Sequence, residues 1–291
     1  MPASPLHAPV LAWYAAAARD LPWRAPGGDA WGVLVSEVML QQTPVDRVVP
    51  VWEAWLARWP SPAALAADPP GEAVRMWGRL GYPRRALRLH GAATECVARF
   101  DGRVPTAYEE LRSLPGVGDY TAAAVQAFAY GRRAVVLDTN VRRVLARLLA
   151  GEAMPRPSVT VPERAAAEVV LPDDDAGAAT WSVAVMELGA LVCTASAPAC
   201  GSCPVAAQCA WVAAGRPAYD GPARTVQRFA GTDRQVRGLL MAVLRDADAP
   251  VARSELDAVW PDEIQRERAL DALVADGLAD PRDDGTYALP R

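Results

Sequence analysis

Glu37 is an acidic residue in apolar surroundings, where its charge is costly and where a carboxyl group could act as an acid. It lies in the segment Gly32–Thr43, and on a helix its neighbours at i−4, i−3 and i+3 are Val33, Leu34 and Leu40. Burial raises the pKa of a carboxyl group, which suits a proton donor at neutral pH. The alternative is a Glu at a domain interface that pairs with an Arg.

Asp138 is a second candidate carboxylate, placed between an apolar run and a helix expected over Val141–Leu149. Asp is a common helix N-cap, but Thr139 and Asn140 could also cap this helix and would leave Asp138 available for chemistry. Cleavage of a glycosidic bond needs one acid to protonate the leaving group and one carboxylate to stabilise the sugar cation. Glu37 and Asp138 fit these two roles.

Four of the five cysteines fall in one short stretch, at Cys193, Cys200, Cys203 and Cys209. The first twenty residues show no export signal, so disulfides are not expected. Four thiolates in one loop suit zinc or an iron–sulfur cluster. Zinc ribbons usually carry two Cys-x-x-Cys pairs and this stretch has one, which favours the cluster. Cys96 is expected to be a small buried hydrophobe.

A helix, a tight turn and a second helix are expected around Leu114–Gly118, with the Ala-rich second helix over Thr121–Tyr130. Gly116 and Gly118 let the backbone N–H groups near Val117 converge beside a helix N-terminus. Such a turn binds a phosphate without any side-chain charge. The alternative is an ordinary helix–helix turn that uses glycine.

The charge pattern limits the function classes. All 30 basic residues are Arg, no Lys occurs, and the formal net charge is −4. Residues 231–291 hold 8 Arg against 13 acidic residues, so the rest of the chain is near neutral. Binding to nucleic acid would therefore depend on local arrangement of charged residues rather than on net charge.

With only two His, a His-rich metal site is excluded. No apolar run could span a bilayer, and we expect a cytoplasmic, nucleoid-associated protein.

Six segments and the four-Cys loop together resemble the catalytic domain of MutY-type adenine DNA glycosylases, in the helix-hairpin-helix superfamily of endonuclease III. The resemblance covers about residues 8–215. The segments are PWR (Pro22–Arg24), SEVMLQQT (Ser36–Thr43), RLGY (Arg79–Tyr82), LPGVGDYTA (Leu114–Ala122), LDTNVRRVLAR (Leu137–Arg147) and MELGALVCT (Met186–Thr194). The x6-x2-x5 spacing of the Cys loop is similar to the [4Fe–4S] loop of these families, so the resemblance implies this cofactor.

The resemblance implies a DNA glycosylase of base excision repair that hydrolyses the N-glycosidic bond of adenine mispaired with 8-oxoguanine or G in double-stranded DNA. Glu37 would protonate adenine N7, and Asp138 would stabilise or trap the oxocarbenium sugar. Tyr120 and Asn140 would support the two carboxylates. Bifunctional relatives cut the strand through a hairpin lysine, where this chain has Tyr120. We therefore expect a monofunctional hydrolase without lysine-based lyase activity.

Similar proteins extrude the target nucleotide and fill the gap that it leaves. The resemblance assigns DNA contacts to Gln41, Gln42, Thr43 and Tyr82 as well as to the hairpin. Gln42 and Tyr82 would enter the base stack, and Thr43 would lie near the base opposite the target.

Several further residues are candidates for DNA or base contacts. Arg84, Arg85 and Arg88 follow Tyr82 and could contact phosphates, although Arg clusters on helices are often only solvated. Arg24 and Trp31 could line the base pocket, but with ten Trp in the chain any one of them also suits the core.

Two features depart from the family pattern. Many members have Glu or Gln reaching adenine where this chain has Val183. In place of a full Nudix-like domain, the tail predicts helices over Arg234–Leu244, Ser254–Val259 and Glu263–Ala275 and a hairpin around Asp283–Gly285. This order suggests a small winged-helix-like unit. Its acidity argues against a DNA-binding wing and for packing or a protein partner.

We therefore expect an all-α, two-domain helix-hairpin-helix glycosylase fold with a [4Fe–4S] loop and a small winged-helix-like C-terminal unit, as a monomer. The expected parts are a six-helix barrel-like domain (22–128), a cluster domain (1–21 and 129–212), a linker (213–231) and the C-terminal unit (232–291).

Two other functions stay open. A thymine glycosylase for G:T mismatches would share the hairpin Tyr, the Asp and the cluster, but would not need Glu37 in its present setting. A non-catalytic DNA-binding regulator could sense oxidants through the cluster, although the retained Glu37 and Asp138 pair argues against it.

Overall fold

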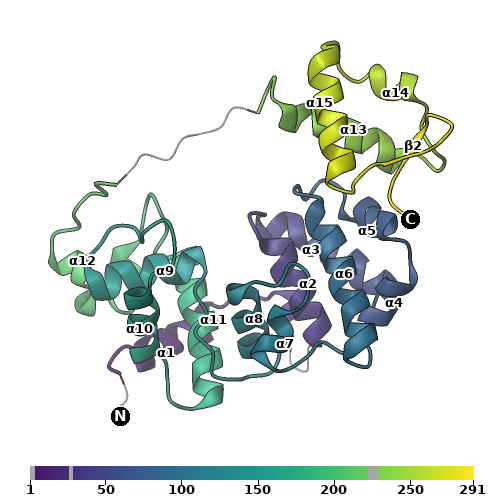
Figure 1. The fold of residues 1–291 in the computed structure, drawn as a ribbon. Helices are drawn as coiled ribbons and strands as arrows, with labels where there is room; N and C mark the ends of the chain where they lie inside the picture. The colour runs from purple at the N-terminus through teal and green to yellow at the C-terminus, as the bar shows by residue number, and fades with distance from the viewer. Residues whose placement is uncertain (1–3, 26–28, 222–228) are drawn as a thin grey trace. The chain divides into compact units, whose positions relative to one another are not determined.

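The computed structural model describes residues 4–25, 29–221 and 229–291 (Figure 1). Apart from one short two-stranded sheet, the regular elements of these residues are helices, which confirms the predicted all-α class. The chain forms two compact units. Unit 1 comprises Met1–Glu37, Thr106–Arg112 and Val117–Pro222, and unit 2 comprises Val38–Pro105, Ser113–Gly116 and Ala223–Arg291.

The domain boundaries expected from the sequence, at 22–128, 1–21 with 129–212, and 232–291, stay a prediction. Residues 222–228 of the predicted linker 213–231 lie outside the described residues.

Unit 1 is an assembly of helices from both ends of its sequence range. Its α-helices are α1 (His7–Ala17), the first part of α2 (Ala30–Leu40), α7 (Tyr108–Arg112), α8 (Asp119–Phe128), α9 (Thr139–Leu145), α10 (Val161–Val169), α11 (Asp175–Leu191) and α12 (Ala210–Ala213). Its other helical turns are the 3₁₀ turns η1 (Pro22–Arg24), η3 (Cys200–Ser202) and η4 (Ala206–Gln208) and the π-helical turn η2 (Ala146–Ala150).

The core of unit 1 forms around α11, which packs against α1, α8 and α9. Val10 of α1 and Leu145 of α9 belong to the same buried cluster as Trp181 and Leu188 of α11. Asp174 caps α11, because its carboxylate accepts a hydrogen bond from the Gly177 N–H. α11 therefore fixes the N-terminal helix beside the elements that follow the hairpin.

Unit 2 contains α3 (Val45–Arg58), α4 (Pro62–Ala67), α5 (Pro70–Trp77), α6 (Arg84–Arg99), α13 (Asp233–Asp246), α14 (Arg253–Asp257), α15 (Glu263–Ala275), β1 (Asp280–Pro281) and β2 (Tyr287–Ala288). Three buried Trp rings pack edge to face at its centre: the Trp55 centroid is 4.7 Å from that of Trp59 and 5.9 Å from that of Trp77. These rings join α3 to α5.

Residues 229–291 of unit 2 form a small lobe, called the C-terminal lobe below. α13 packs against α14 and α15, and β1 pairs antiparallel with β2. Leu240 and Leu273 are fully buried within it. The three helices and the hairpin predicted for this part of the sequence are confirmed.

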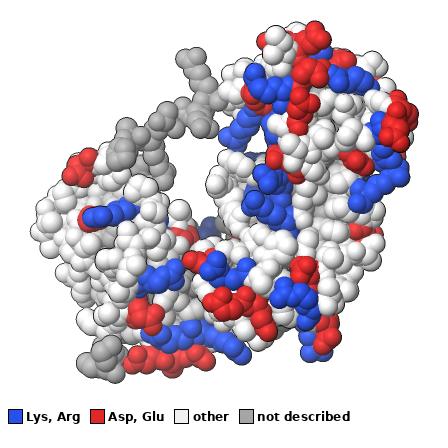
Figure 2. Space-filling view, in the orientation of Figure 1, with Lys and Arg blue, Asp and Glu red and all other residues white. Residues whose placement is uncertain are grey.

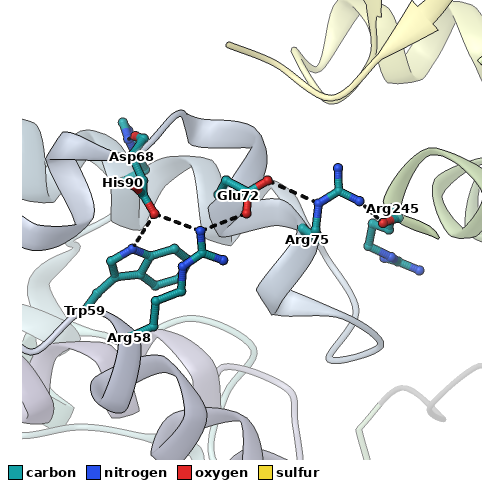
Figure 3. Close-up of polar contacts among 7 residues, drawn as sticks. All are labelled: Arg58, Trp59, Asp68, Glu72, Arg75, His90 and Arg245. Carbon is teal, nitrogen blue, oxygen red and sulfur yellow. Dashed lines mark hydrogen bonds and ion pairs between the residues drawn. The ribbon is translucent and has the colours of Figure 1, made fainter. Parts of the chain in front are cut away.

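The C-terminal lobe packs on α5 through one backbone hydrogen bond and through arginine side chains that bind backbone carbonyls. The Gly71 N–H donates to the Pro290 carbonyl at 2.8 Å, and the Arg245 guanidinium donates to the Gly78 carbonyl at 2.7 Å. Arg75 donates to the Arg245 carbonyl and also pairs with Glu72 (Figure 3). Arg75 of α5 therefore links Glu72 to the C-terminal lobe.

Among the residues that the structure describes, no helix is long and apolar enough to cross a membrane.

Replacement of Gly71 by Ala tests the packing of the lobe. A Cβ there would lie 2.5 Å from the Pro290 oxygen and 2.9 Å from the Leu289 Cβ. Overpacking of this kind costs about 1–3 kcal/mol. We expect a lower denaturation midpoint and faster amide hydrogen exchange in the last residues of the chain.

The matched control is Gly238→Ala on α13, where an added Cβ meets nothing within 4 Å. This substitution should be neutral or stabilising by up to about 1 kcal/mol, because Ala favours the helix over Gly. An unchanged midpoint in Gly71→Ala would contradict the described contact.

Candidate active site

Glu37 is a buried carboxyl group with one hydroxyl donor. It lies on α2, is 5% exposed, and accepts a hydrogen bond of 2.6 Å from the Tyr120 hydroxyl of α8. Burial raises its pKa to about 7, while the Tyr120 hydrogen bond and the charge of Arg24 oppose the rise and the charge of Asp138 adds to it. The alternative, in which Glu37 pairs with an Arg at an interface, is not what the structure shows, because the hydrogen-bond donor to Glu37 is the neutral Tyr120 hydroxyl.

Asp138 is the N-cap of α9, contrary to the idea that Thr139 or Asn140 caps this helix. One carboxylate oxygen accepts from the Val141 N–H at 2.6 Å, and the other accepts from the Asn140 side-chain amide at 2.8 Å. Burial raises the pKa of Asp138, whereas these hydrogen bonds and the charge of Arg143 lower it. Capping does not remove Asp138 from the site, because the same side chain still acts electrostatically on Glu37.

The two carboxyl groups, a buried Glu37 and a half-buried Asp138, therefore act on each other electrostatically but have different hydrogen-bond partners. Glu37 has a hydroxyl donor and a pKa near neutrality, so a large share of it carries a proton at pH 7. Asp138 has two N–H donors that stabilise its ionised form. One acid that can release a proton beside one held carboxylate is the arrangement that glycosidic cleavage requires.

Sequence reasoning missed Glu187, a fully buried carboxylate on α11. Arg19 donates to it from its backbone N–H and from two guanidinium nitrogens, and Arg24 donates at 3.0 Å. Burial alone would raise the pKa of Glu187, but the hydrogen bonds from Arg19 and Arg24 lower it to about 2. A Glu on an otherwise apolar helix was the available signal.

Arg24 links this ion pair to the candidate acid. Its Nη2 is bound to Glu187, while its Nη1 is buried and has no hydrogen-bond partner among the described residues. Its charge lowers the pKa of Glu37. Trp31 is 1% exposed and lies inside the protein. The base-pocket roles of Arg24 and Trp31 stay a prediction.

The predicted helix, turn and second helix are present, and the turn that contains the two glycines joins α7 to α8. Gly116 has a φ of 81°, and a Cβ there would lie 2.8 Å from the Arg88 Cβ, so both the backbone and the space require glycine. Gly118 precedes α8 with no side-chain cap, and nothing lies within 4 Å of the place of its Cβ. Val117 is buried. The first N–H groups of α8 are thus open to an anion.

Gln42 and Tyr82 have backbone conformations that L-residues rarely adopt. Their φ angles are 59° and 48°, two of the four positive values at non-glycine residues of the described chain. Such strain persists where the surroundings enforce it and is frequent at functional sites. Tyr82 is 48% exposed. Both residues line a surface pocket in unit 2, together with Gln41, Arg84, Arg85 and Arg88.

Arg85 is a structural residue rather than the predicted phosphate contact, because it is only 6% exposed. It donates to the carbonyls of Val38 (2.9 Å), Met39 (3.0 Å), Gln41 (2.5 Å) and Gly81 (2.9 Å) and to the Thr43 hydroxyl (2.9 Å). One guanidinium group thereby joins the turn that carries Gln42 to the turn that carries Tyr82. The DNA-binding roles of Gln41, Gln42, Thr43 and Tyr82 stay a prediction.

The cysteine loop is tied to α9 and η2 by two buried arginines. Arg143 donates to the Cys193 carbonyl at 2.7 Å. Arg147 donates to the Cys193 sulfur at 3.3 Å, its carbonyl oxygen accepts from the Cys209 thiol at 3.4 Å, and its guanidinium lies over the Trp211 ring. The helix that begins at the candidate carboxylate therefore also holds the loop.

The four predicted ligands are brought together but are not set in a ligand geometry. Cys209 belongs to the buried core cluster of unit 1, the other three pack against it, and none of the four forms a disulfide. Burial raises the pKa of the Cys203 thiol, and the charges of the other three cysteines raise it further. Within the described ranges, no three His, Cys, Asp or Glu side chains are arranged to hold a metal ion. Four thiols in one loop beside N–H donors are a donor set that suits an iron–sulfur cluster.

Residues 35–168 match the HhH-GPD superfamily of base excision DNA repair proteins. The chain is 54% identical over 281 residues to the adenine DNA glycosylase of Mycolicibacterium smegmatis, over 96% of this chain and 94% of that protein. It is 51% identical over 282 residues to the adenine DNA glycosylase of Mycobacterium tuberculosis, over 97% of this chain and 92% of that protein. The chain belongs to the adenine DNA glycosylase family.

The fold is also that of solved relatives in the wider superfamily. A thermostable thymine-DNA glycosylase aligns with a TM-score of 0.63 and 25% identity, over 71% of this chain and 94% of that one. The resemblance to the adenine DNA glycosylase family stated from the sequence is confirmed. Because the two mycobacterial family members align over nearly the whole chain, the match to them extends into the C-terminal lobe.

Replacement of Tyr120 by Phe should raise the pKa of Glu37 above its value of about 7, because the lost hydroxyl stabilised the ionised carboxylate. Infrared difference spectroscopy of the carboxyl band across neutral pH measures this shift. Tyr108→Phe is the matched control, since the Tyr108 hydroxyl bonds Asp119 instead. A Glu37 pKa that falls in Tyr120→Phe would contradict the described contact.

Proposed function

We propose that this protein is an adenine DNA glycosylase of base excision repair, which hydrolyses the N-glycosidic bond of adenine mispaired with 8-oxoguanine or G in double-stranded DNA. The observation that carries the proposal is the buried Glu37, whose pKa the charge of Asp138 helps to raise, with the Tyr120 hydroxyl bonded to Glu37 and the Asn140 amide bonded to Asp138. Membership of the adenine DNA glycosylase family supports it.

Glu37 is the general acid of the proposed reaction. A carboxyl group with a pKa of about 7 is partly protonated at neutral pH and can give its proton to adenine N7. Protonation makes the base a better leaving group and weakens its bond to the sugar. Tyr120 orients the carboxyl group and moderates its pKa.

Asp138 stabilises the positive charge that develops on the sugar, or traps the oxocarbenium ion. Its hydrogen bonds from Val141 and Asn140 fix the carboxylate before the charge appears, so little reorganisation is needed during the reaction. Water then completes hydrolysis at the sugar carbon that the base has left.

The proposed enzyme is monofunctional. Strand cleavage through a Schiff base needs a side-chain amine, and the sequence contains no lysine. Tyr120 stands where bifunctional relatives have the hairpin lysine, and its hydroxyl is already bound to Glu37.

Two groups of residues in this protein are proposed to contact DNA. The hairpin residues Gly116, Val117 and Gly118 would bind a phosphate through backbone N–H groups. Gln42 and Tyr82 would enter the base stack, and the exposure of Tyr82 in a strained turn supports this role.

We propose Cys193, Cys200, Cys203 and Cys209 as ligands of a [4Fe–4S] cluster. Bound there, the cluster would cross-link the loop and hold its shape, and the proposed hydrolysis requires no electron transfer. Arg147 supplies an N–H donor to the Cys193 sulfur, as is common around cluster ligands.

We further propose a monomer that acts at the nucleoid of the cytoplasm, where its DNA substrate lies. The acidic outer surface of the C-terminal lobe, with 13 acidic residues in 231–291, offers a site for a protein partner.

Duplexes that hold A opposite 8-oxoguanine, A opposite G, and T opposite G test the reaction, each with and without hot alkali. We expect strand breaks at A only after alkali. Glu37→Gln should bind the A duplex and lower the single-turnover rate about 100-fold or more, since general acid catalysis contributes on this scale. Arg268→Ala, on the surface of the lobe, is the control that should keep the rate.

Each other outcome has a distinct meaning. Cleavage at T would assign the protein to thymine glycosylases such as the solved relative. Breaks without alkali would contradict the monofunctional assignment. DNA binding without any cleavage, unchanged in Glu37→Gln, would assign a regulator.

Iron and acid-labile sulfide analysis of the purified protein tests the cofactor. We expect about four iron atoms per chain and the visible absorption of a cluster, both lost in Cys200→Ser. Cys96→Ser is the control, because this buried cysteine lies outside the loop and should not change the iron content. Bound zinc in place of iron would contradict the proposal.

A further inference from the structure

Two guanidinium groups lie over the ring of Tyr82, and they come from different parts of unit 2. The Arg85 carbon Cζ is 5.7 Å from the ring centroid, and that of Arg234 is 5.3 Å from it. Arg85 lies in the first turn of α6, whereas Arg234 belongs to α13 of the C-terminal lobe. Cations at this distance over an aromatic face are attracted to it.

Arg234 differs from the other charged arginines of the lobe in its partners. Arg237, Arg253, Arg266, Arg268 and Arg282 each pair with a carboxylate of the lobe. Arg234 is exposed and, among the described residues, makes no ion pair; its neighbours are the rings of Tyr82 and Phe229. Most arginines of the lobe therefore pair with carboxylates of the same lobe, whereas the guanidinium group of Arg234 lies over the Tyr82 ring.

The lobe contacts the Tyr82 turn at two further points. Arg245 donates to the Gly78 carbonyl at 2.7 Å, on the N-terminal side of Tyr82. On the other side, Asp276 pairs with Arg84 at 3.1 Å and with Arg237 at 2.5 Å. The segment 78–84 is thus held before, at and after Tyr82.

This segment needs support because its backbone is strained. Gly81 has a φ of 85° and Tyr82 a φ of 48°. Glycine adopts positive φ angles at little cost, whereas the tyrosine is strained there. A non-glycine residue in the left-handed region persists when surrounding contacts enforce it. Arg85 supplies one such contact by donating to the Gly81 carbonyl. The lobe supplies the contacts to Gly78, Tyr82 and Arg84.

We propose that the C-terminal lobe is part of the DNA-binding machinery, and that Arg234 is a positioning residue that holds Tyr82 ready to enter the duplex. This inference rests on the proposed function, in which Tyr82 fills the space of an extruded nucleotide. The lobe lowers the cost of ordering the turn when DNA binds, because the turn is already fixed.

The acidity of the lobe does not conflict with this role. In the face shown in Figure 2, basic side chains gather where the C-terminal helices meet the helices of residues 38–105, and acidic side chains are frequent on the outer part of the lobe. On the side that faces the Tyr82 turn, Arg234 and Arg245 supply basic groups, and the carboxylate of Asp276 pairs with Arg84.

Arg234→Ala should weaken binding to a duplex with a tetrahydrofuran abasic site opposite 8-oxoguanine by about threefold to tenfold, the range of a partly exposed cation–π contact. The single-turnover excision rate at saturating protein should change little, because Arg234 touches neither Glu37 nor Asp138. A 2-aminopurine next to the abasic site should report less unstacking. Arg234→Lys, which keeps a cation over the ring, should restore most of the affinity.

Tyr82→Ala and the double variant establish whether Arg234 acts through Tyr82. In the Tyr82→Ala background, Arg234→Ala should have no further effect on affinity or fluorescence. Arg268→Ala removes the same charge from the same lobe, where its partner is Asp233, and should bind as the unchanged protein does. Thermal unfolding of each variant identifies any loss of folded protein.

Three results would overturn the inference: unchanged affinity in Arg234→Ala, an equal loss in Arg268→Ala, or additive losses in the double variant. None of them bears on excision by the unaltered protein, which tests the proposed function separately. If the unaltered protein excises adenine and Tyr82→Ala binds weakly while Arg234→Ala binds normally, only the inference fails.

Discussion

The structure of the site depends on the burial of a carboxyl group with a neutral partner. Glu37 is enclosed by α2 and α8 and bonded by the Tyr120 hydroxyl rather than by an arginine. A guanidinium in contact would have kept it ionised, as Arg19 and Arg24 do for Glu187. The difference in partners separates the pKa of about 7 of Glu37 from the pKa of about 2 of Glu187, although both side chains are buried. The first can exchange a proton at neutral pH, and the second holds the N-terminal segment in place.

Arginine supplies all the Lys-type and Arg-type cations of this protein, whereas other proteins use both residues. A guanidinium group offers several donors in a fixed plane, so one side chain can bind several carbonyls at once. Arg85 joins the turns of Gln42 and Tyr82 in this way, and Arg143 and Arg147 join α9 to the cysteine loop. These side chains satisfy loop carbonyls that would otherwise be buried without partners. The absence of lysine also limits the chemistry of the site, since no side-chain amine is present to form an imine.

The C-terminal lobe gives the Tyr82 turn a support that the helical body alone does not provide. Hydrogen bonds to the backbone of Gly71 and Gly78 fix the lobe on α5, while Arg234 lies over the Tyr82 ring and Asp276 pairs with Arg84 after it. The network of Figure 3 continues this support into α3 through Glu72 and Asp68. The lobe is thereby connected to the part of the chain that carries the candidate wedge, rather than attached only through the linker.

The sequence by itself determined the features that depend on neighbours in the chain. The hairpin, the four-Cys loop, the three helices of the tail and the candidates Glu37 and Asp138 all follow from local spacing, because helix periodicity, turn glycines and ligand spacing are short-range. Only the tertiary structure decided which partner each buried polar group has. It made Asp138 a helix cap, made Arg85 a buried brace rather than a phosphate contact, paired Glu187 with Arg19 and Arg24, and placed Arg234 over Tyr82. These contacts join residues far apart in the sequence, and no local pattern specifies which of 30 arginines will fill a given site.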